Sequence, residues 1–545
     1  MAVVVVNDRE VEVPDDLRLN CIQVAARAGV EIPHYCWHPA LSVVASCRMC
    51  LIEVGEKKAD GSITMQPKLV PACQTPARHG TVIVSNSERV RAAQKATLEY
   101  LLLNHPLDCP VCDQAGECYL QDYSFRYGRG YSRLRDEKIV HADKDYIGDN
   151  IVLFTDRCIM CSRCVRFTRE ISGTAELEIV NRGAHAEIDI FPGRPCNNKL
   201  SGNVVDLCPV GALCSKDFLY KQRVWFLRSH ASVCPLCSTG CSIWIDENKG
   251  IAYRIRPRVN EKSQGYFICD DGRGCHKFVN DRRRILTPRR RHGKHWDELS
   301  WEECLDQLRG LERKKRRAVL VLSPWLTCEE MWLAWQWAHR LADECAVVPG
   351  PSPVSGTDDA YPKGPGGSAP PTGAERFVIR AEKCPNGTGL RWLMQRLRRL
   401  ENFQASLSSL GSLEGASLIV FGGYLTPWLD SSMLKSLREA DYLAVFELFP
   451  NELTESADLL VPAATFAEKE GTFINYKGLA QAITRAIRPF GNNLTEGEIL
   501  WRLLGRQGLY NASEVRKEMS IDDQCPLLPD VIPPQGVFVS YGREG

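Results

Sequence analysis

The sequence lacks a long hydrophobic run and a strong excess of one charge. Nowhere does it contain the roughly 18 consecutive apolar residues that a membrane-spanning helix needs, so we expect a soluble chain with no direct membrane span. The formal net charge is only +1. Basic runs occur at Arg282–Arg284, Arg289–His292 and Arg313–Arg317, but acidic residues balance them overall. Solvated faces or contacts with other protein chains are therefore favoured over binding to nucleic acid.

Targeting and nucleotide-binding signatures are also lacking. The start, MAVVVVNDREVEVP, has neither a basic segment followed by a small-residue cleavage site nor an Arg- and Ser-rich amphipathic pattern, so we expect no signal or transit peptide. The chain contains no GxGxxG fingerprint and no Walker loop. Any chemistry on a dinucleotide is therefore expected on a partner chain.

Cysteine is what the sequence has in excess. It contains 24 cysteines, and nineteen of them precede residue 280. A secreted disulfide scaffold would be short and would carry an export signal, whereas closely spaced Cys-x-x-Cys motifs in an unexported chain indicate metal binding. We therefore expect a metal-binding protein in a reducing compartment.

The hydrophobic pattern predicts several domains, because 545 residues are too many for one core of about 150 residues. β-Branched runs at 3–6 and 11–13 around Asn7-Asp8 predict a hairpin, and residues 17–30 have helical spacing. Further short strands are expected at 51–54, 68–70 and 81–84, followed by a helix at 87–103. Together they predict a small sheet with a helix laid across it.

The second half of the chain has a different pattern, and we expect a boundary near residue 225. Helices are predicted at 301–311 and 328–341, and buried strands at 318–322 and 418–423. This alternation favours an α/β layer. Residues 349–373 hold seven prolines and six glycines and are expected to form a linker or a long surface loop.

The first ligand set is Cys36, Cys47, Cys50 and Cys73. A two-iron cluster needs four converging thiolates, and a loop that carries three of them, with a fourth returned by the sheet, can supply these. The uneven spacing, C-x10-C-x2-C-x22-C, is closer to plant-type ferredoxins than to paired zinc motifs. Zinc remains an alternative.

The second set is His105, Cys109, Cys112 and Cys118. No fourth cysteine lies close behind Cys118, so the imidazole of His105 is the candidate fourth ligand of a four-iron cluster. The alternative is a purely structural histidine. On charge alone, neutral histidine in place of a thiolate makes a cluster easier to reduce.

The third set is Cys158, Cys161, Cys164 and the distant Cys208, which is followed by proline. Three cysteines at i, i+3 and i+6 wrap one face of a four-iron cube, and a remote Cys-Pro completes it. A second cluster on the same loop would need a cysteine near position 168, which is Thr168. This set therefore predicts a single four-iron cluster.

The fourth set is Cys234, Cys237, Cys241 and Cys269, with spacing C-x2-C-x3-C-x27-C. By spacing alone it suits a structural zinc as well as a four-iron cluster. The small residues around Cys241 favour a cluster, because they allow backbone N–H groups to approach sulfur closely. The remaining cysteines are expected to be buried apolar thiols rather than ligands: Cys21, Cys196, Cys214, Cys275, Cys304, Cys328, Cys345, Cys384 and Cys525.

Six segments together resemble the large iron–sulfur subunit, of the G or 75 kDa type, of bacterial respiratory NADH:quinone oxidoreductase, complex I. They are PHYCWHPAL, SCRMCLIEV, LLLNHPLDCPVCDQAGECYLQD, CIMCSRCVRFTREISG, SGNVVDLCPVGAL and ICDDGRG. The resemblance is close over residues 1–280 and fainter to the end, through ADLLVPAATFAEKEGTFINYKGLAQ at 457–481.

The resemblance implies a multidomain α+β and α/β protein with one 2Fe-2S cluster and three 4Fe-4S clusters. Its implied domains are a β-grasp two-iron ferredoxin domain at 1–85, a His/Cys3 four-iron domain at 86–145 and a four-iron ferredoxin-like domain at 146–224. A four-iron domain of molybdopterin-oxidoreductase type follows at 225–280, and a truncated, cofactor-free molybdopterin-oxidoreductase-like α/β domain at 281–545. The cluster of the fourth set is implied to lie off the main electron path and points to a bacterial source.

The resemblance also implies a function as an electron relay. Single electrons are expected to enter the Cys36 set from flavin- and iron–sulfur-bearing NADH-oxidising subunits. They then pass to the Cys158 set and the His105 set, and leave to a downstream iron–sulfur subunit toward quinone. The implied location is the cytoplasmic side of the bacterial inner membrane, held there through complex partners.

Molybdenum catalysis is the main alternative, as in the α subunit of an NAD-linked molybdenum or tungsten formate dehydrogenase. Active molybdopterin enzymes usually place a relay lysine just after the last cluster cysteine, whereas here Asp270 follows Cys269. The region after Cys269 is also short, so no molybdopterin is expected. An electron-input subunit of a soluble hydrogenase is a third possibility, although such subunits end near residue 230 or carry a second ferredoxin-type loop.

Overall fold

The computed structural model describes residues 1–14, 16–312, 317–363, 376–400, 412–521 and 528–539. The described chain forms two compact units. The first is Met1–Phe226 with the described part of Tyr361–Arg376, and the second is the described part of Leu227–Ala360 and Phe377–Gly545. The break after Phe226 lies beside the boundary expected near residue 225, and the smaller domains within each unit stay a prediction. Cys525 and most of the basic run at 313–317 lie outside the described residues.

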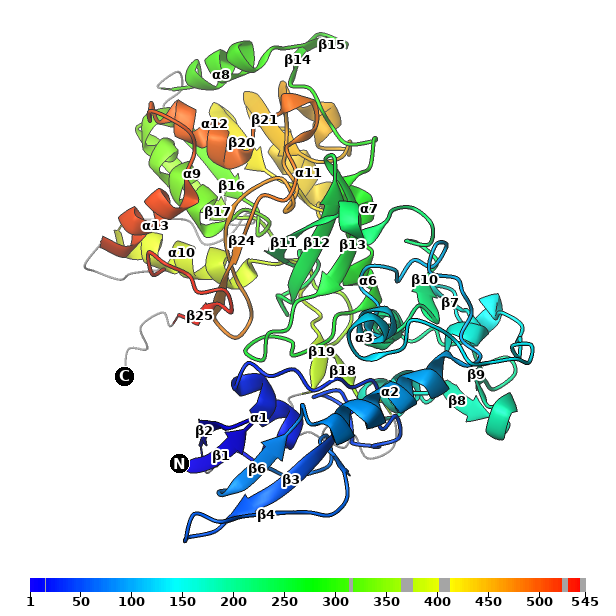
Figure 1. Ribbon diagram of the computed structural model, residues 1–545. Helices are drawn as coiled ribbons and strands as arrows, with labels where there is room; N and C mark the ends of the chain where they lie inside the picture. The colour runs from blue at the N-terminus through cyan, green and yellow to red at the C-terminus, as the bar shows by residue number, and fades with distance from the viewer. Residues whose placement is uncertain (15, 313–316, 364–375, 401–411, 522–527, 540–545) are drawn as a thin grey trace. The chain divides into compact units, whose positions relative to one another are not determined.

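The first unit combines a small sheet with loop-rich segments (Figure 1). Its strands are β1 (Ala2–Val6), β2 (Arg9–Val13), β3 (Leu51–Lys57), β4 (Ile63–Met65), β5 (Val70–Pro71), β6 (Thr81–Val84), β7 (Ile151–Leu153), β8 (Leu177–Val180), β9 (Glu187–Ile190) and β10 (Leu213–Ser215). Its helices are α1 (Cys21–Arg27), α2 (Glu88–Leu102), α3 (Tyr119–Tyr127), α4 (Arg163–Phe167) and α5 (Asn203–Leu207).

The N-terminal sheet has the order β2-β1-β6-β3-β4, with β5 paired to β3. The predicted hairpin is confirmed, because β1 and β2 pair antiparallel and Asn7 and Asp8 both have positive φ, as a two-residue hairpin turn of type I′ requires. Alternate β1 residues, Val4 and Val6, are buried in a core that also contains Ile22 of α1. A helix therefore lies against this sheet, as expected.

Two expectations in this region needed correction of their bounds. The helix expected over 17–30 forms only at Cys21–Arg27, because the Asn20 side chain caps its first turn and Gly29, with φ of 73°, follows its end. The strand expected at 68–70 forms as the two-residue β5 at Val70–Pro71. Proline has no N–H to donate, which limits how far a strand can extend.

The described part of the second unit contains three sheets of three or more strands and most of the long helices. Its strands are β11 (Arg228–Val233), β12 (Ser242–Asn248), β13 (Ile251–Pro257), β14 (Arg289–His292), β15 (His295–Glu298), β16 (Arg317–Leu322), β17 (Glu344–Pro349), β19 (Phe377–Ile379), β20 (Ala416–Phe421), β21 (Tyr442–Glu447), β22 (Leu459–Pro462), β23 (Gly471–Ile474), β24 (Leu479–Ile483) and β25 (Val537–Phe538). Its helices are α6 (Asp270–Arg273), α7 (His276–Val279), α8 (Trp301–Arg309), α9 (Cys328–Leu341), α10 (Gly387–Leu400), α11 (Ser431–Leu437), α12 (Glu496–Leu503) and α13 (Ala512–Ile521). The short β18 (Asp359–Tyr361) lies at the boundary between the units.

The largest sheet has the order β15-β14-β22-β21-β20-β16-β17, and its strands from β22 to β17 are parallel. Helices cover both faces. In β16, Leu320 and Leu322 pack in the core that contains α8, α9, α10, α12 and α13, whereas Val319 and Val321 pack with Leu434 of α11. Because these strands are buried on both faces, their sequences are continuous apolar runs. The predicted α/β layer is confirmed.

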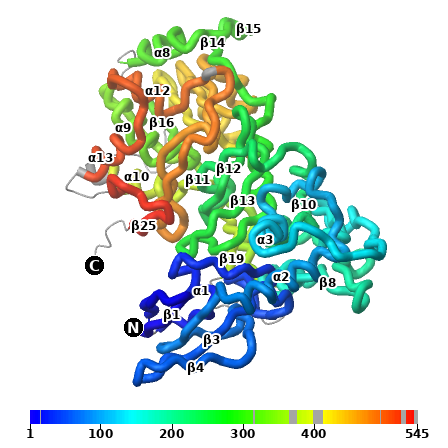
Figure 2. The backbone as a smooth tube through the Cα atoms, in the orientation of Figure 1, coloured from blue at the N-terminus to red at the C-terminus, as the bar shows by residue number. Residues whose placement is uncertain are grey.

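Segments far apart in sequence meet on one face of this sheet. Figure 2 shows α12 and α13 beside α9, and residues of all three helices share one core.

Residues 359–361 of the proline- and glycine-rich segment form β18 instead of a loop, and residues 364–375 of that segment lie outside the described chain. No helix among the described residues is long and apolar enough to span a membrane.

Candidate functional site

The first cysteine set is brought together at one end of the N-terminal sheet. Cys50 directly precedes β3, Cys73 follows β5, and Cys36 and Cys47 lie in the loop between α1 and β3. The Cys36 side chain is within hydrogen-bonding reach of the side chains of Cys47 and Cys73, and Cys50 is within reach of Cys73. The Cys36 N–H also points to the Cys47 sulfur at 3.5 Å. All four sulfurs therefore converge, as a two-iron cluster requires.

The loop around Cys47 has an unusual backbone. Ala45 and Arg48 have φ of 51° and 55°, a left-handed conformation that non-glycine residues rarely adopt. The same feature recurs around Cys161, where Met160 and Ser162 have φ of 53° and 59°. Such residues turn successive N–H groups toward a concave loop, which suits an anionic centre. Sequence reasoning did not anticipate these conformations, because none of the four residues is glycine.

The third set encloses a cavity. Cys158, Cys161, Cys164 and Cys208 all line it, together with apolar residues that include Leu153, Ile188 and Leu213. The backbone N–H groups of Val210, Ala212 and Leu213 point to the Cys208 sulfur, and the Met160 N–H lies 3.4 Å from the Cys158 sulfur. Four sulfurs around an apolar cavity, with N–H donors directed at them, match the requirements of a four-iron cluster.

The second set lies in the loop between α2 and α3. Cys112 and Cys118 are buried and Cys109 is exposed. Burial lowers the pKa of His105 to about 4, so the ring is neutral near pH 7. Its Nδ1 atom is buried and has no hydrogen-bond partner among the described residues. A half-buried, neutral imidazole whose buried nitrogen is unsatisfied fits a metal ligand, since buried polar atoms are otherwise nearly always paired.

The loop of the third set packs against the second set. A Cβ at Gly211 would lie 2.2 Å from the Cys112 sulfur, so only glycine fits in the CPVGAL segment at this position. The Tyr119 N–H donates to the carbonyl of Pro209 at 3.1 Å. Arg157, which precedes Cys158, forms an ion pair with Asp108 at 2.8 Å. The second and third sets are therefore neighbours in the first unit.

The fourth set lies in the second unit, at the ends of β11 and β12. The Cys234 N–H donates to the Cys241 carbonyl at 2.9 Å, and the Gly272 N–H points to the Cys269 sulfur at 3.3 Å. A Cβ at Gly272 would lie 3.1 Å from the Cys234 sulfur and 3.4 Å from the Cys269 sulfur. This glycine allows the first turn of α6 to approach the sulfurs, as a cluster site needs.

Among the cysteines expected to be plain buried thiols, Cys275 stands apart. Its side chain is within hydrogen-bonding reach of Cys234. Cys345 is only half-buried, and these others are buried as expected: Cys21, Cys196, Cys214, Cys304, Cys328 and Cys384. In the described part of the chain, no group of three or more His, Cys, Asp or Glu side chains is arranged to hold a single metal ion.

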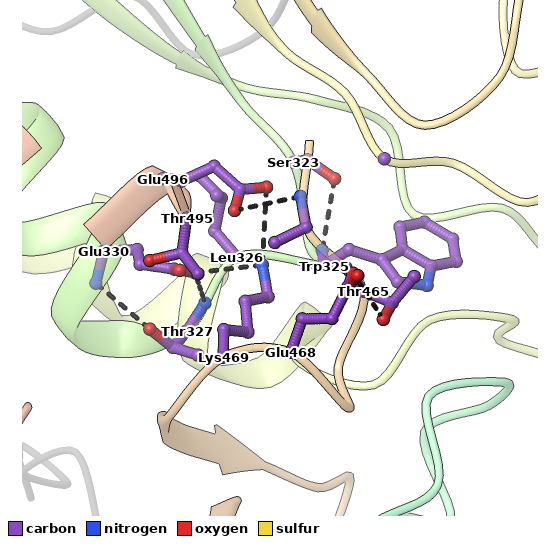
Figure 3. A network of polar contacts seen from close by, with 12 residues as sticks. Ser323, Trp325, Leu326, Thr327, Glu330, Thr465, Glu468, Lys469, Thr495 and Glu496 are labelled. Carbon is purple, nitrogen blue, oxygen red and sulfur yellow. Dashed lines mark hydrogen bonds and ion pairs between the residues drawn. The ribbon is translucent and has the colours of Figure 1, made fainter. Parts of the chain in front are cut away.

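A second cavity lies at the carboxyl ends of the parallel strands, where Trp325, Gly422 and Leu448 follow β16, β20 and β21. Figure 3 shows the buried polar network beside it. Lys469 Nζ lies 3.1 Å from Glu330 and 3.5 Å from Glu496, and both Lys469 and Glu496 line the cavity. Ligands of α/β folds bind at this edge of the sheet, and here the cavity is lined by an ion pair of the chain itself.

Five stretches of the chain match known protein families, and each cysteine set falls within a different match. Residues 3–88 match the 2Fe-2S iron-sulfur cluster binding domain, and 94–133 the NADH-ubiquinone oxidoreductase-G iron-sulfur binding region. Residues 148–214 match the ferredoxin-like domain of NADH-quinone oxidoreductase subunit 3. Residues 227–281 match the molybdopterin oxidoreductase Fe4S4 domain, and 420–506 the molybdopterin oxidoreductase family.

Curated relatives belong to one enzyme complex. The G-type subunit of NADH-quinone oxidoreductase from Rickettsia felis (strain ATCC VR-1525 / URRWXCal2) is 39% identical over 301 residues, which cover 54% of this chain and 43% of that protein. The NADH-ubiquinone oxidoreductase 75 kDa subunit of Reclinomonas americana is 36% identical over 341 residues, which cover 62% of this chain and 48% of that protein. The chain is a homologue of this G-type, or 75 kDa, subunit. It spans about half the length of the curated relatives that it matches.

A solved structure is also similar in sequence to this chain. A chain from the crystal structure of the NAD+-reducing [NiFe]-hydrogenase in the H2-reduced state is 25% identical. The match covers 41% of the present chain and 91% of the hydrogenase chain, with a TM-score of 0.34.

The family matches confirm the predicted fold class of the chain: an N-terminal 2Fe-2S ferredoxin-like domain, 4Fe-4S domains and a molybdopterin-oxidoreductase-like part. Within each unit the structure brings the cysteines of a set together, whereas the contact of His105 with its set stays a prediction. Sequence reasoning missed Arg163 and Arg166 of α4, which lie inside the motif CSRCVRF. The sequence signal that could have identified these two residues is the position of arginines between the ligand cysteines of the third set.

Proposed function

We propose that this chain is an electron-transfer subunit of an NADH:quinone oxidoreductase. It would relay single electrons from flavin- and iron–sulfur-bearing NADH-oxidising subunits to a downstream iron–sulfur subunit, toward quinone. The observation that carries the proposal is the cavity lined by Cys158, Cys161, Cys164 and Cys208, with backbone N–H groups directed at its sulfurs. The ordered family matches and the curated relatives support it.

Four groups of side chains would hold the clusters. A 2Fe-2S cluster would be held by Cys36, Cys47, Cys50 and Cys73, and 4Fe-4S clusters by the other three sets: His105, Cys109, Cys112 and Cys118; Cys158, Cys161, Cys164 and Cys208; Cys234, Cys237, Cys241 and Cys269. An iron–sulfur cluster supplies a site that takes up and returns one electron. The protein supplies burial, N–H donors and fixed ligand positions, which set the potential.

Burial makes the thiols of Cys161 and Cys118 unsuited to free thiol chemistry. Burial raises the pKa of Cys161 to about 11 and that of Cys118 to about 12. Without metal these groups stay protonated at pH 7, and binding of a metal releases their protons. Their role is therefore to hold a centre away from water.

Partners and location follow from the same proposal. The flavin and the quinone site would belong to other subunits, and the chain would be held peripherally on the cytoplasmic side of a bacterial inner membrane. No nucleic acid is involved, since the basic residues Arg289 and Arg290 face the carboxylates of Glu298 and Asp297 across a hairpin.

The test uses the full chain, purified without oxygen. Quantified iron and acid-labile sulfide, with EPR spectra recorded during a redox titration, should reveal one two-iron signal and three four-iron signals. Cys161→Ser should remove one four-iron signal, whereas Cys304→Ser, at a buried thiol of α8, should leave all of them. Stoichiometric zinc without iron in the third set would refute the proposal.

The alternative considered from the sequence is the α subunit of an NAD-linked molybdenum or tungsten formate dehydrogenase, and two stretches of the chain match molybdopterin oxidoreductase families. Two observations speak for the relay instead. Asp270, not lysine, follows Cys269, and Lys469 and Glu496, which line the cavity at the edge of the sheet where a ligand would bind, form an ion pair with each other. About one molybdenum or tungsten per purified chain would decide for the formate dehydrogenase; their absence beside full iron content would decide for the relay.

A further inference from the structure

Two arginines of the first unit lie between the first and third cysteine sets. Arg163 and Arg166 both belong to α4, which also carries Cys164. They are 5% and 8% exposed, an uncommon degree of burial for a permanently charged side chain. Each guanidinium carries five donor N–H groups and stays charged at all ordinary pH values.

Arg166 bridges the two sets directly. Its Nη2 donates to the carbonyl oxygen of Cys36 in the first set and, at 3.2 Å, to that of Cys161 in the third. Its Nη1 donates to the carbonyl of Ser42, in the same loop as Cys36. One planar side chain therefore holds the ligand loops of both sets in a common arrangement.

Arg163 repeats this pattern one turn earlier. Its Nη2 donates to the carbonyl of Trp37, next to Cys36, at 2.6 Å. Its Nη1 donates to the carbonyl of Leu207, next to Cys208, at 3.2 Å. Both guanidinium groups thus join a backbone carbonyl beside the first set to one beside the third.

Among the described residues, no carboxylate contacts either guanidinium directly, although the charge of Glu170 acts on Arg166 through space. In the described part of the chain neither guanidinium forms an ion pair with Asp or Glu, and their partners are uncharged carbonyl and hydroxyl oxygens. Glu170, the acidic group nearest to Arg166 in sequence, accepts from the N–H and hydroxyl of Ser42. A buried cation without a direct ion pair is costly, so anionic centres at the two cysteine sets would stabilise both guanidinium groups.

We propose that Arg166, supported by Arg163, is a positioning residue that couples the two sets and raises the reduction potential of the clusters in both. The inference rests on the proposed function, since it requires clusters in the Cys36 and Cys158 sets. Reduction adds negative charge to a cluster. A fixed positive charge in a buried region favours the reduced form, and hydrogen bonds from one guanidinium to both loops fix the clusters relative to each other.

The test compares Arg166→Gln and Arg166→Lys with the unchanged full chain, in EPR-monitored redox titrations. Arg166→Gln should move the midpoint potentials of both the two-iron signal and one four-iron signal to more negative values. Arg166→Lys keeps the charge but cannot reach both carbonyls, so it should preserve most of the potential while broadening the signals. Arg169→Gln is the matched control, because Arg169 lies in the next turn, is exposed and pairs only weakly with Glu178 at 3.7 Å.

Separate outcomes address the inference and the function. Two signals in Arg166→Gln at unchanged potentials, with full iron content, would overturn the inference and leave the relay standing. If the unchanged chain shows no two-iron and four-iron signals at all, the proposed function itself fails. If Arg166→Gln loses iron, the Arg166→Lys variant decides. Midpoint potentials that shift no more in Arg166→Lys than in the control Arg169→Gln support a role for the positive charge. A large negative shift in Arg166→Lys, in which the charge is kept, refutes that role.

Discussion

The surroundings of two side chains, His105 and Glu447, shift their pKa values away from the ordinary ones. The imidazole of His105 is neutral because burial disfavours its charged form, and its Nδ1 has no partner in the described chain. Glu447, at the end of β21, is fully buried, and one of its oxygens accepts from the N–H groups of Gly423 and Leu448. Its other oxygen has no partner among the described residues. Both residues lend themselves to direct tests.

Changing His105 to Ala should alter or abolish one four-iron EPR signal and leave the two-iron signal intact, because only the second set loses a ligand. His105→Cys replaces a neutral ligand by an anionic one and should retain the cluster at a more negative potential. EPR spectra of the reduced full chain provide the measurement. His185→Ala, at an exposed position, is the control, and an unchanged spectrum in His105→Ala would refute the role of His105 as ligand.

The pH dependence of stability should reveal Glu447. Burial raises its pKa from the ordinary 4.5 to about 7. The folded state therefore holds this proton more tightly than the unfolded state, so its stabilising contribution is complete below pH 4.5 and is lost as the pH rises to about 7. The loss amounts to roughly 3 kcal/mol.

Glu447→Gln removes this titration, so chemical unfolding between pH 5 and pH 8 should show a smaller decline in stability than in the unchanged chain. Glu455→Gln, at an exposed residue nearby, should leave the decline as it is. A decline of equal size in the Glu447→Gln variant would show that Glu447 does not titrate as described.

At the scale of elements, loops carry the function and regular elements position them. Left-handed residues bend the loops around Cys47 and Cys161, Cys208 is the C-cap of α5, and Cys269 is the N-cap of α6. In the second unit, capping boxes at Thr327 and Thr495 start α9 and α12 beside Glu330 and Glu496. Helix ends therefore gather both the sulfur ligands and the buried charges.

The contact between two loops gives a further prediction. Gly211→Ala should disturb the cluster of the second set, although Gly211 belongs to the loop of the third set, because a Cβ would lie 2.2 Å from the Cys112 sulfur. The expected result is loss or broadening of the four-iron signal that His105→Ala also affects.

EPR of the two variants side by side is the measurement. Gly130→Ala serves as the control, since a Cβ there meets nothing within 4 Å. A Gly211→Ala variant with an unaltered spectrum would mean that the CPVGAL loop and the second set do not approach each other this closely.

The two units of the whole molecule are stabilised in different ways. The first has a small apolar core around α1 and otherwise depends on loops that carry buried thiols and buried arginines. The second has a parallel sheet with apolar cores on both faces. Metal should therefore contribute a larger share of stability to the first unit, since small cores supply little on their own.

Removal of iron tests this difference. After anaerobic chelation, hydrogen exchange followed by mass spectrometry should show strongly increased exchange in peptides around Cys36, Cys118 and Cys161. Peptides of β16, β20 and β21 should remain protected, because their amides lie inside a doubly covered sheet. Equal loss of protection in both groups of peptides would contradict a separate source of stability for the sheet.

The sequence by itself determined the chemistry and the main elements. Cysteine spacing is enough to propose each ligand set, since a cluster imposes a short list of separations on a loop, and the hydrophobic period identifies strands such as β16 and helices such as α9. Only the tertiary structure decided which sets are neighbours. The approach of Gly211 to Cys112, the bridge from Arg166 to Cys36 and Cys161, and the proximity of Cys275 to Cys234 all join residues through packing. The physical reason is that such contacts depend on how loops fold back in space, which no local pattern of residues encodes.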